Sequence, residues 1–543
     1  MTAPRLAACI VALATVTAAI SAAEPEFSAD RIRAHVTFLA DDLLDGREAG
    51  TRGHDIAAGY IASQFALLGV KPGGQNGGYF FKVDLLESSL TGAAPTLAVT
   101  ASRGTQTLKH RGNVFVKGPI AGEAVNLSAP LVFVGFGMKD AAVGYDDYKS
   151  LDVRGKIVVA LYGSPKGIDS EVGAHLQSEQ ARVAAEHGAV AIISVMTHTT
   201  ARAFPWQQVL ELVRDESTTW VRRDGKPFDP SYGLKASAII EPTVADSLFA
   251  GAAKTLNQIL NEADQAGGRP QGFELTATAT ITVATKVRRY SSPDVIGIVE
   301  GSDPRLKNEY VVLMGHADHI GVKKEGAGDR INNGALDNAA GTATLIEVAR
   351  ALTVAPDRPR RSVLLVANTA EEKGLLGAES FAHAPTVPID RMVAAIDLDM
   401  PMLLYNFTDV VAYGATHSTL KGVFEKTAAA MGVTLSPDPM PEQAVFVRSD
   451  HYTMVKQGVP AVMLATGMAN GGDKAWATYL STHYHRPSDD LSLPIVWSAG
   501  AKFAEFNYRV VRALADADGR PQWYAKDYFG DLFAPKAAKA QIP

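Results

Sequence analysis

The most informative segment for the fold is Val311-Val312-Leu313-Met314-Gly315-His316-Ala317-Asp318-His319. Its four leading apolar residues, two of them β-branched, predict a buried strand of a parallel sheet. Gly315 ends this strand, and His316 follows at its carboxyl end. Open α/β sheets bind ligands just beyond the carboxyl ends of their strands. A His-x-Asp pair in that position suits a metal ligand whose second ring nitrogen is held by a carboxylate, although an ordinary loop histidine fits the pattern too.

From Ser292 onward, predicted strands and helices alternate along the chain, which is typical of a doubly wound α/β sheet. The strands are expected at 295–299, 310–314, 362–368, 393–398 and 461–464. The helices are expected at 338–352, 376–383, 418–431, 451–457 and 497–514. This order predicts a mostly parallel sheet with helices on both faces.

The chain before Ser292 shows two other patterns. Residues 29–74 predict two amphipathic helices joined by a loop at 43–51, for which we expect a solvated connection. Residues 113–286 are richer in predicted strands, and apolar residues alternate across 273–283. The histidines of this region are scattered, and we expect surface or packing roles for His175, His187 and His198. The sequence therefore predicts a separate, inserted β-rich domain.

Length and charge narrow the class of protein. A chain of 543 residues exceeds what one hydrophobic core usually supports, which favours more than one domain. With 47% hydrophobic and 20% charged residues, the composition is that of a folded protein. A net charge of −6 without long basic runs argues against nucleic acid or an anionic membrane surface as the main partner.

Residues 1–23 have the pattern of a signal peptide. Arg5 supplies the positive charge, Leu6 to Ile20 form an apolar stretch too short for a comfortable membrane span, and Ser21-Ala22-Ala23 is a small-residue cleavage site. The only cysteine, Cys9, lies inside this segment. We expect an exported protein, periplasmic or secreted, with no disulfide and no stable membrane anchor.

Four further segments of the α/β region place polar side chains at strand ends or helix starts. They are Asp337-Asn338, Glu371-Glu372, Asp399-Met400 and the loop 482–490 with His483 and His485. Each has an ordinary alternative, such as a helix cap, a solvated charge pair or an exposed histidine. Together with His316, however, all of them fall on the edge of the sheet where sites form, and this favours a shared metal centre.

In order and context, these motifs resemble the two-zinc exopeptidases, a family that includes bacterial leucyl aminopeptidases, aminopeptidase Y and glutamate carboxypeptidase. The resemblance extends loosely to the N-terminal loop Asp45-Gly46-Arg47. Residues 125–285 resemble the protease-associated domain inserted in many members, chiefly through residues 148–158. The implied division is a signal peptide at 1–23, an N-terminal part of the catalytic domain at 24–112, the insert at 113–286 and the catalytic domain at 287–543.

The resemblance also implies a role for each motif residue. Asp337 would bridge two zinc ions, with His316 and Asp399 completing one site and Glu372 and His485 the other. Glu371 would be the general base, Asp318 would orient His316, and Tyr484 would steady the tetrahedral intermediate. Family members place segments such as Ser449-Asp450-His451 beside the substrate pocket, and relatives carry a cis bond at the position of Asp337-Asn338. His319, His451 and His483 are surplus to the ligand count.

The chemistry of these residue types agrees with that assignment. Histidine and carboxylate ligands suit Zn²⁺, and Co²⁺ or Mn²⁺ could substitute. Three carboxylates and one bridging hydroxide balance the charge of two zinc ions, and two such ions activate water and polarise a carbonyl. Glu371 would move the proton from water to the leaving amine. We therefore expect peptide substrates and, since acidic side chains outnumber arginines near the motifs, an aminopeptidase.

Several alternatives remain open from the sequence. A glutamate-carboxypeptidase-like enzyme would need arginines for carboxylates, and only Arg448 and Arg486 lie near the motifs. A non-catalytic binding protein or a single-zinc cyclase of N-terminal glutamine could share the fold, but the complete ligand set disfavours both. Asp397 would tune the metal site if its strand continued through Asp399, and would otherwise be solvated or hydrogen-bonded.

Overall fold

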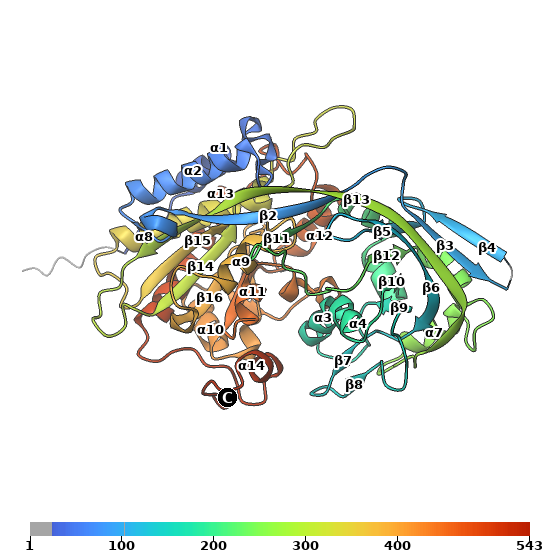
Figure 1. The fold of residues 1–543 in the computed structure, drawn as a ribbon. Helices are drawn as coiled ribbons and strands as arrows, with labels where there is room; N and C mark the ends of the chain where they lie inside the picture. The colour runs from blue at the N-terminus through green and yellow to red at the C-terminus, as the bar shows by residue number, and fades with distance from the viewer. Residues whose placement is uncertain (1–23, 103, 543) are drawn as a thin grey trace, which may run out of the picture.

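Two β-sheets share one long strand in the computed structural model, which describes residues 24–102 and 104–542 (Figure 1). The predicted signal peptide at 1–23 lies outside the described residues. The shared strand is β13 (Phe273–Val299), whose first half pairs with β3 and β6 and whose second half pairs with β2 and β15. No helix in the described ranges is long and apolar enough to cross a membrane.

The first sheet confirms the predicted α/β fold. Its strand order is β11-β2-β13-β15-β14-β16-β19-β17-β18, and the four central strands β15, β14, β16 and β19 are parallel. The bounds are β2 (Phe80–Leu90), β11 (Ser217–Trp220), β14 (Tyr310–His316), β15 (Ser362–Asn368), β16 (Met392–Asp397), β17 (Asp409–Tyr413), β18 (Thr434–Ser436) and β19 (Ala461–Thr466). The short β1 (Lys71–Pro72) also pairs with β13.

Helices cover this sheet. They are α1 (Ala29–Leu39), α2 (Arg52–Leu67), α8 (Ala340–Val354), α9 (Leu376–His383), α10 (Leu420–Ala430), α11 (His451–Val455), α12 (Gly472–Thr482), α13 (Trp497–Asp516) and α14 (Tyr528–Phe533). Helices α8 and α13 pack together against β14 and β15, while α9 and α11 pack against each other. Figure 1 shows α1, α2 and α13 above the sheet and α11 and α14 below it.

The central strands are buried on both faces, which explains their sequence. Every residue of β15, β16 and β19 is buried, and so is every residue of β14 except Tyr310. Val, Ile, Leu and Ala fill these positions because helices cover the strands from both sides. Polar residues are therefore left to the carboxyl ends of the strands, where the loops begin.

The second sheet has the order β4-β3-β13-β6-β9-β10-β12-β5. Its strands are β3 (Thr96–Ala101), β4 (Gly104–Lys109), β5 (Val114–Lys117), β6 (Ala124–Phe133), β9 (Ile157–Tyr162), β10 (Ala191–Met196) and β12 (Ala236–Ile240). Its helices are α3 (Ser170–Ser178), α4 (Gln180–Glu186), α5 (His198–Ala203), α6 (Trp206–Leu212) and α7 (Leu256–Ala263), and a small pair, β7 (Lys139–Asp140) with β8 (Tyr145–Asp146), lies beside them.

Strand β13 is longer than the strands predicted from the sequence. The sequence predicted strands at 273–283 and 295–299, whereas one strand of 27 residues covers both and continues between them. The boundary expected between residues 286 and 287 therefore falls within a strand, and β3 and β4, which precede residue 113, belong to the second sheet. The two sheets are consequently joined through continuous backbone hydrogen bonding.

The loop at 43–51 is also different from the solvated connection expected from its composition. Asp45, Gly46 and Arg47 all have positive φ values of 46°, 66° and 50°. A Cβ at Gly46 would lie 2.5 Å from the carbonyl oxygen of Asn332, so only glycine fits there. The Arg47 side chain is 1% exposed. Gly46 and Arg47 are buried whereas Leu43 and Asp45 are exposed, so only one side of this loop is solvated.

The buried side chain of His417 links helix α3 to the C-terminal segment around Asp527. His417 follows β17, and its ring nitrogens are hydrogen-bonded to Asp527, at 2.6 Å, and to Glu171 of α3. Burial alone would lower the pKa of His417, but the hydrogen bonds to Asp527 and Glu171 outweigh it and raise the pKa to about 10. The protonated ring thus holds together segments that are far apart in the sequence.

We predict that His417→Gln lowers the free energy of unfolding by about 3 kcal/mol near pH 6, because two buried carboxylates lose their cation. The folded-state pKa lies above the unfolded value, so the contribution is complete below about pH 6.5 and is lost as the pH rises toward 10. The difference between variant and wild type in urea unfolding should therefore shrink at alkaline pH. Lys421→Gln, which breaks an exposed pair with Glu425, should change little; an equal, pH-independent loss in both variants would contradict the prediction.

Candidate metal centre

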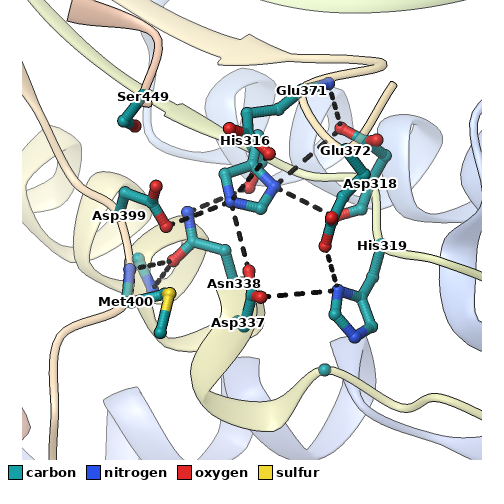
Figure 2. Close-up of polar contacts among 12 residues, drawn as sticks. His316, Asp318, His319, Asp337, Asn338, Glu371, Glu372, Asp399, Met400 and Ser449 are labelled. Carbon is teal, nitrogen blue, oxygen red and sulfur yellow. Dashed lines mark hydrogen bonds and ion pairs between the residues drawn. The ribbon is translucent and has the colours of Figure 1, made fainter. Parts of the chain in front are cut away.

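The metal centre lies at the carboxyl edge of the parallel strands, where the sequence placed it. His316 ends β14, Glu371 and Glu372 follow β15, and Asp399 comes two residues after the end of β16. Asp337 precedes α8, and the peptide bond between Asp337 and Asn338 is cis. Figure 2 shows these side chains converging on one small volume.

The spacing of these side chains fits bound zinc. Ligands that surround zinc tetrahedrally at about 2.0–2.1 Å lie roughly 3.3 Å from one another. The His316 Nε2 atom lies 3.2 Å from Asp399 Oδ1 and 3.4 Å from Asp337 Oδ1. These three side chains are therefore separated as ligands of one ion would be.

A second set repeats the spacing on the other side of Asp337. The His485 Nε2 atom lies 3.4 Å from Asp337 Oδ2 and 3.0 Å from Glu372 Oε2. One oxygen of Asp337 thus faces each histidine, so the carboxylate can belong to both sets. His316, Asp337 and Asp399 form one group of potential metal ligands, and His319, Asp337 and Glu372 form a second. The second group thus contains His319 and not His485, so the contacts of the two histidines must decide between them.

His319, which was surplus to the ligand count expected from the sequence, lies within the site. Its ring is fully buried, and its Nδ1 atom lies only 2.6 Å from Glu372 Oε1, while Asp337 Oδ2 is 3.9 Å away. A separation of 2.6 Å is a hydrogen bond and leaves no space for an ion between the two atoms. His319 therefore orients Glu372, and its position five residues beyond the predicted strand 310–314 was the only signal in the sequence.

Glu371 is placed differently from the ligands. Its Oε2 atom approaches His316 Nε2 no closer than 4.0 Å, and its backbone N–H donates to Asp318 Oδ1 at 3.1 Å. Burial, together with the nearby charges of Asp399 and Glu372, raises the pKa of Glu371 well above the usual value for a glutamate. A carboxylate with a raised pKa that stands beside, not within, the ligand set is suited to proton transfer.

Asp318 acts through a route other than the one the resemblance implied. The His316 Nδ1 atom is hydrogen-bonded to the backbone carbonyl oxygen of Asp318, at 3.1 Å, while the nearest carboxylate oxygen is 3.9 Å away. The carboxylate instead accepts the Glu371 N–H. Asp318 consequently positions both a predicted ligand and the predicted base.

The segment 449–451 only partly faces the pocket. Ser449 lines it, but Asp450 and His451 are fully buried and do not line it. Asp450 accepts a hydrogen bond from the Asn368 side chain at 2.7 Å. The buried strand β16 ends at Asp397, which accepts hydrogen bonds from Ser449 Oγ and from the His451 N–H. Of the two roles that the sequence left open for Asp397, the structure therefore shows the hydrogen-bonded one. Because strand β16 ends at Asp397, this residue does not share a strand face with Asp399.

Three of the residues with an uncommon backbone conformation lie beside or among the predicted ligands. Ala370, Met400 and His485 have positive φ values of 55°, 49° and 57°, which are uncommon for residues with a Cβ. Each is either a predicted site residue or the direct neighbour of one. Such strained positions are typical of functional sites, where the surrounding structure holds them in place.

A pocket opens directly from the metal centre. It is lined by Asp337, Glu371, Asp399 and His485 at one end and by a mainly apolar wall at the other. The apolar wall consists of Met400, Tyr413, Met440, Val445, Met463, Ala465, Trp476 and Leu480. Such a wall favours an apolar side chain next to the reacting bond.

Tyr484 and Arg448 form a polar corner of this pocket. The Arg448 guanidinium donates to the Tyr484 hydroxyl at 3.3 Å and to the Gln443 carbonyl at 3.1 Å. Burial raises the pKa of Tyr484, so its hydroxyl stays protonated. Arg486, the other arginine near the motifs, forms an ion pair with Glu211 of α6 at 2.8 Å.

Residues 294–511 match the family described as peptidase family M28. This region of the chain is similar to the M28 peptidases. The matched region contains all the predicted ligands and the predicted base, and it begins within the shared strand β13.

One solved structure has the same fold over most of the chain, beyond residues 294–511. The aminopeptidase from Aneurinibacillus sp. strain AM-1 superposes with a TM-score of 0.53 at 19% identity, covering 91% of this chain and 95% of that one. The zinc aminopeptidase from Bacillus subtilis aligns with a TM-score of 0.44 and 17% identity, covering 91% of this chain and 97% of that one. At 19% identity, the likeness to the Aneurinibacillus aminopeptidase concerns the fold alone.

A curated relative matches a shorter stretch. Mouse (Mus musculus) aminopeptidase NAALADL1 is 30% identical over 141 residues, which is 25% of this chain and 17% of the relative. The alignment therefore spans about a sixth of the relative's length.

The distances around Asp337 and Glu372 favour His485 over His319 as the histidine ligand of the second set. We expect His485→Ala to lower zinc content by one ion per chain, because its Nε2 atom lies at ligand spacing. His319→Gln removes only a hydrogen bond to Glu372 and should retain the zinc stoichiometry with weaker binding. Metal analysis of both purified variants checks this prediction; loss of one ion in His319→Gln, with full content in His485→Ala, would exchange the two roles.

Proposed function

We propose that this protein is an exported zinc aminopeptidase that releases N-terminal residues with apolar side chains from peptides. The observation that carries the proposal is the division of the Asp337 carboxylate between two sets of side chains at zinc-ligand spacing, with Glu371 beside them and an apolar pocket next to both. The M28 match and the name of the NAALADL1 relative support the same activity. Export rests on the signal-peptide pattern of residues 1–23.

His316, Asp337, Asp399, Glu372 and His485 would hold the zinc ions. Zinc bound there would supply an acidified water and a polarised scissile carbonyl. The histidines offer their Nε2 atoms, and the His316 Nδ1 atom is occupied by the carbonyl oxygen of Asp318. That hydrogen bond fixes the ring so that Nε2 faces the site with its lone pair available.

Glu371 moves the proton. It accepts a proton from the water whose oxygen attacks the scissile carbonyl carbon, and it delivers that proton to the departing amine as the carbon–nitrogen bond breaks. The carboxylate is held for this task by its backbone hydrogen bond to Asp318. The products are a free amino acid and a peptide shortened by one residue.

Tyr484 stabilises the negative charge that develops on the carbonyl oxygen. Arg448 donates to the Tyr484 oxygen, so the phenolic proton remains available for the substrate. The guanidinium also holds the tyrosine in place, because it is bound at the same time to Gln443. Together they place a hydrogen-bond donor at the pocket.

The inserted region limits the length of substrate on the side of the pocket. The Arg448 guanidinium lies 5.9 Å from the centre of the Phe204 ring, and Glu211 pairs with Arg486 next to His485. Residues of the second sheet's helices therefore flank the rim. A rim flanked on this side would favour a chain end over the middle of a long chain, which supports an exopeptidase.

We predict that Glu371→Gln reduces kcat by about 10²–10⁴-fold, because the amide cannot accept the proton, while zinc content stays at the wild-type value. Glu325→Gln, a change of the same type on an exposed loop, should leave both properties unaltered. Steady-state kinetics and metal analysis on the same preparations check this. Full activity in Glu371→Gln would remove the base from the mechanism.

A panel of substrates tests the proposed specificity. We expect leucyl and phenylalanyl substrates with a free amino group to be cleaved faster than glutamyl ones, because the pocket wall is mainly apolar. N-blocked peptides should resist cleavage. Arg448 forms no ion pair among the described residues, so a carboxylate of the substrate could also bind it; preferred cleavage of N-blocked peptides with a C-terminal acidic residue would favour a glutamate-carboxypeptidase-like enzyme instead.

A further inference from the structure

Arg47 is a buried residue that takes no part in the proposed mechanism. It belongs to the segment 42–48, which overlaps the loop at 43–51 and is called the 42–48 loop below. Arg47 is 1% exposed, and its guanidinium forms no ion pair within the described residues, which is unusual for a buried charge. Its hydrogen bonds all go to backbone carbonyl oxygens. The role of Arg47 follows from the segments to which these carbonyl groups belong.

Three separate segments meet at the Arg47 guanidinium. Its Nε atom donates to the carbonyl oxygen of Ala317 at 3.1 Å, and Nη2 donates to Gly334 at 3.1 Å. The Nη1 atom donates to Asn333 at 2.5 Å and also to Leu39 at the end of α1. Ala317 lies directly after His316, and Gly334 lies three residues before Asp337. The arginine therefore joins both metal-binding loops to the N-terminal helix.

Further contacts tie the same pieces together. The N–H groups of His319 and Gly321 donate to the carbonyl oxygens of Arg47 and Gly46, at 3.3 Å and 3.1 Å. In return the Asn333 side chain donates to Ala40 at 3.0 Å and to Asp42 at 2.8 Å. The contacts run in both directions, so the 42–48 loop and the two ligand loops form one hydrogen-bonded unit.

The charge of Arg47 also suits its position. Burial lowers the pKa of Arg47 to about 10, while the surrounding Asp489, Asp318, Asp337 and Glu372 act in the opposite direction and keep it charged at neutral pH. The guanidinium is thus an internal cation beneath an acidic cluster. It offsets part of the repulsion among these carboxylates before any metal binds.

We propose that Arg47 is a positioning residue for the metal centre: its guanidinium clamps the loops of His316 and Asp337 in ligand geometry from behind. The inference rests on the proposed zinc site but concerns a residue outside the ligand set. Arginine is required because its planar fork has five donors, whereas lysine has three donors on a single atom and cannot reach the same carbonyls together.

The test compares Arg47→Lys with Arg52→Lys, an exposed arginine five positions along the chain. Zinc dissociation constants are measured by competition with a chromogenic chelator, and the melting temperature of each metal-free protein is measured alongside. We expect Arg47→Lys to weaken zinc binding about 10- to 100-fold, as is usual when a residue that holds metal ligands is lost. The melting temperature of metal-free Arg47→Lys should fall only slightly, in contrast to this large loss of zinc affinity. Arg52→Lys should match the wild type in both melting temperature and zinc affinity.

A second variant protects the test against a folding failure. Asn333→Ala removes two hydrogen bonds between the same loops without touching the buried charge, and it should weaken zinc binding by a smaller factor. Wild-type zinc affinity in a folded Arg47→Lys or Asn333→Ala protein would overturn the inference alone. A wild-type protein that binds no zinc would overturn the proposed function and the inference together.

Discussion

The structure of the site depends on one shared carboxylate. Asp337 presents Oδ1 to His316 and Oδ2 to His485, with nearly equal separations of 3.4 Å. For this to happen, the loop before α8 must meet the end of β14 from one side and the loop after α12 from the other. The parallel sheet brings these pieces together at one edge, because all four central strands end there.

Such an arrangement concentrates negative charge in the interior. Asp318, Asp337, Asp399 and Asp489 are all less than 9% exposed, and burying carboxylates is costly unless cations or hydrogen bonds compensate them. The protein supplies part of that compensation itself. Asp489 accepts the N–H groups of Leu336 and Asp337 and the Tyr479 hydroxyl, and Arg47 places a cation below. Zinc would provide the remainder, so binding metal and holding the fold are linked at this site.

The sequence predicted the parts of the molecule that local patterns determine. Apolar strands followed by glycine or by acidic residues located the sheet and the edge of the site, because both signals lie within a few residues of each other. It could not predict contacts between distant segments. The burial of Arg47 depends on carbonyl groups near residues 317 and 333, the His417 cluster unites residues 171, 417 and 527, and the continuity of β13 depends on partners from both sheets. The hydrogen bond that makes His319 a partner of Glu372 likewise exists only in three dimensions.

The most direct test of this account is the number and position of zinc ions in the wild-type protein. Elemental analysis of the purified chain, followed by anomalous X-ray diffraction at the zinc edge, measures both. The account predicts two ions per chain, one on each side of the Asp337 carboxylate. A single ion, or two ions that do not share Asp337, would contradict it.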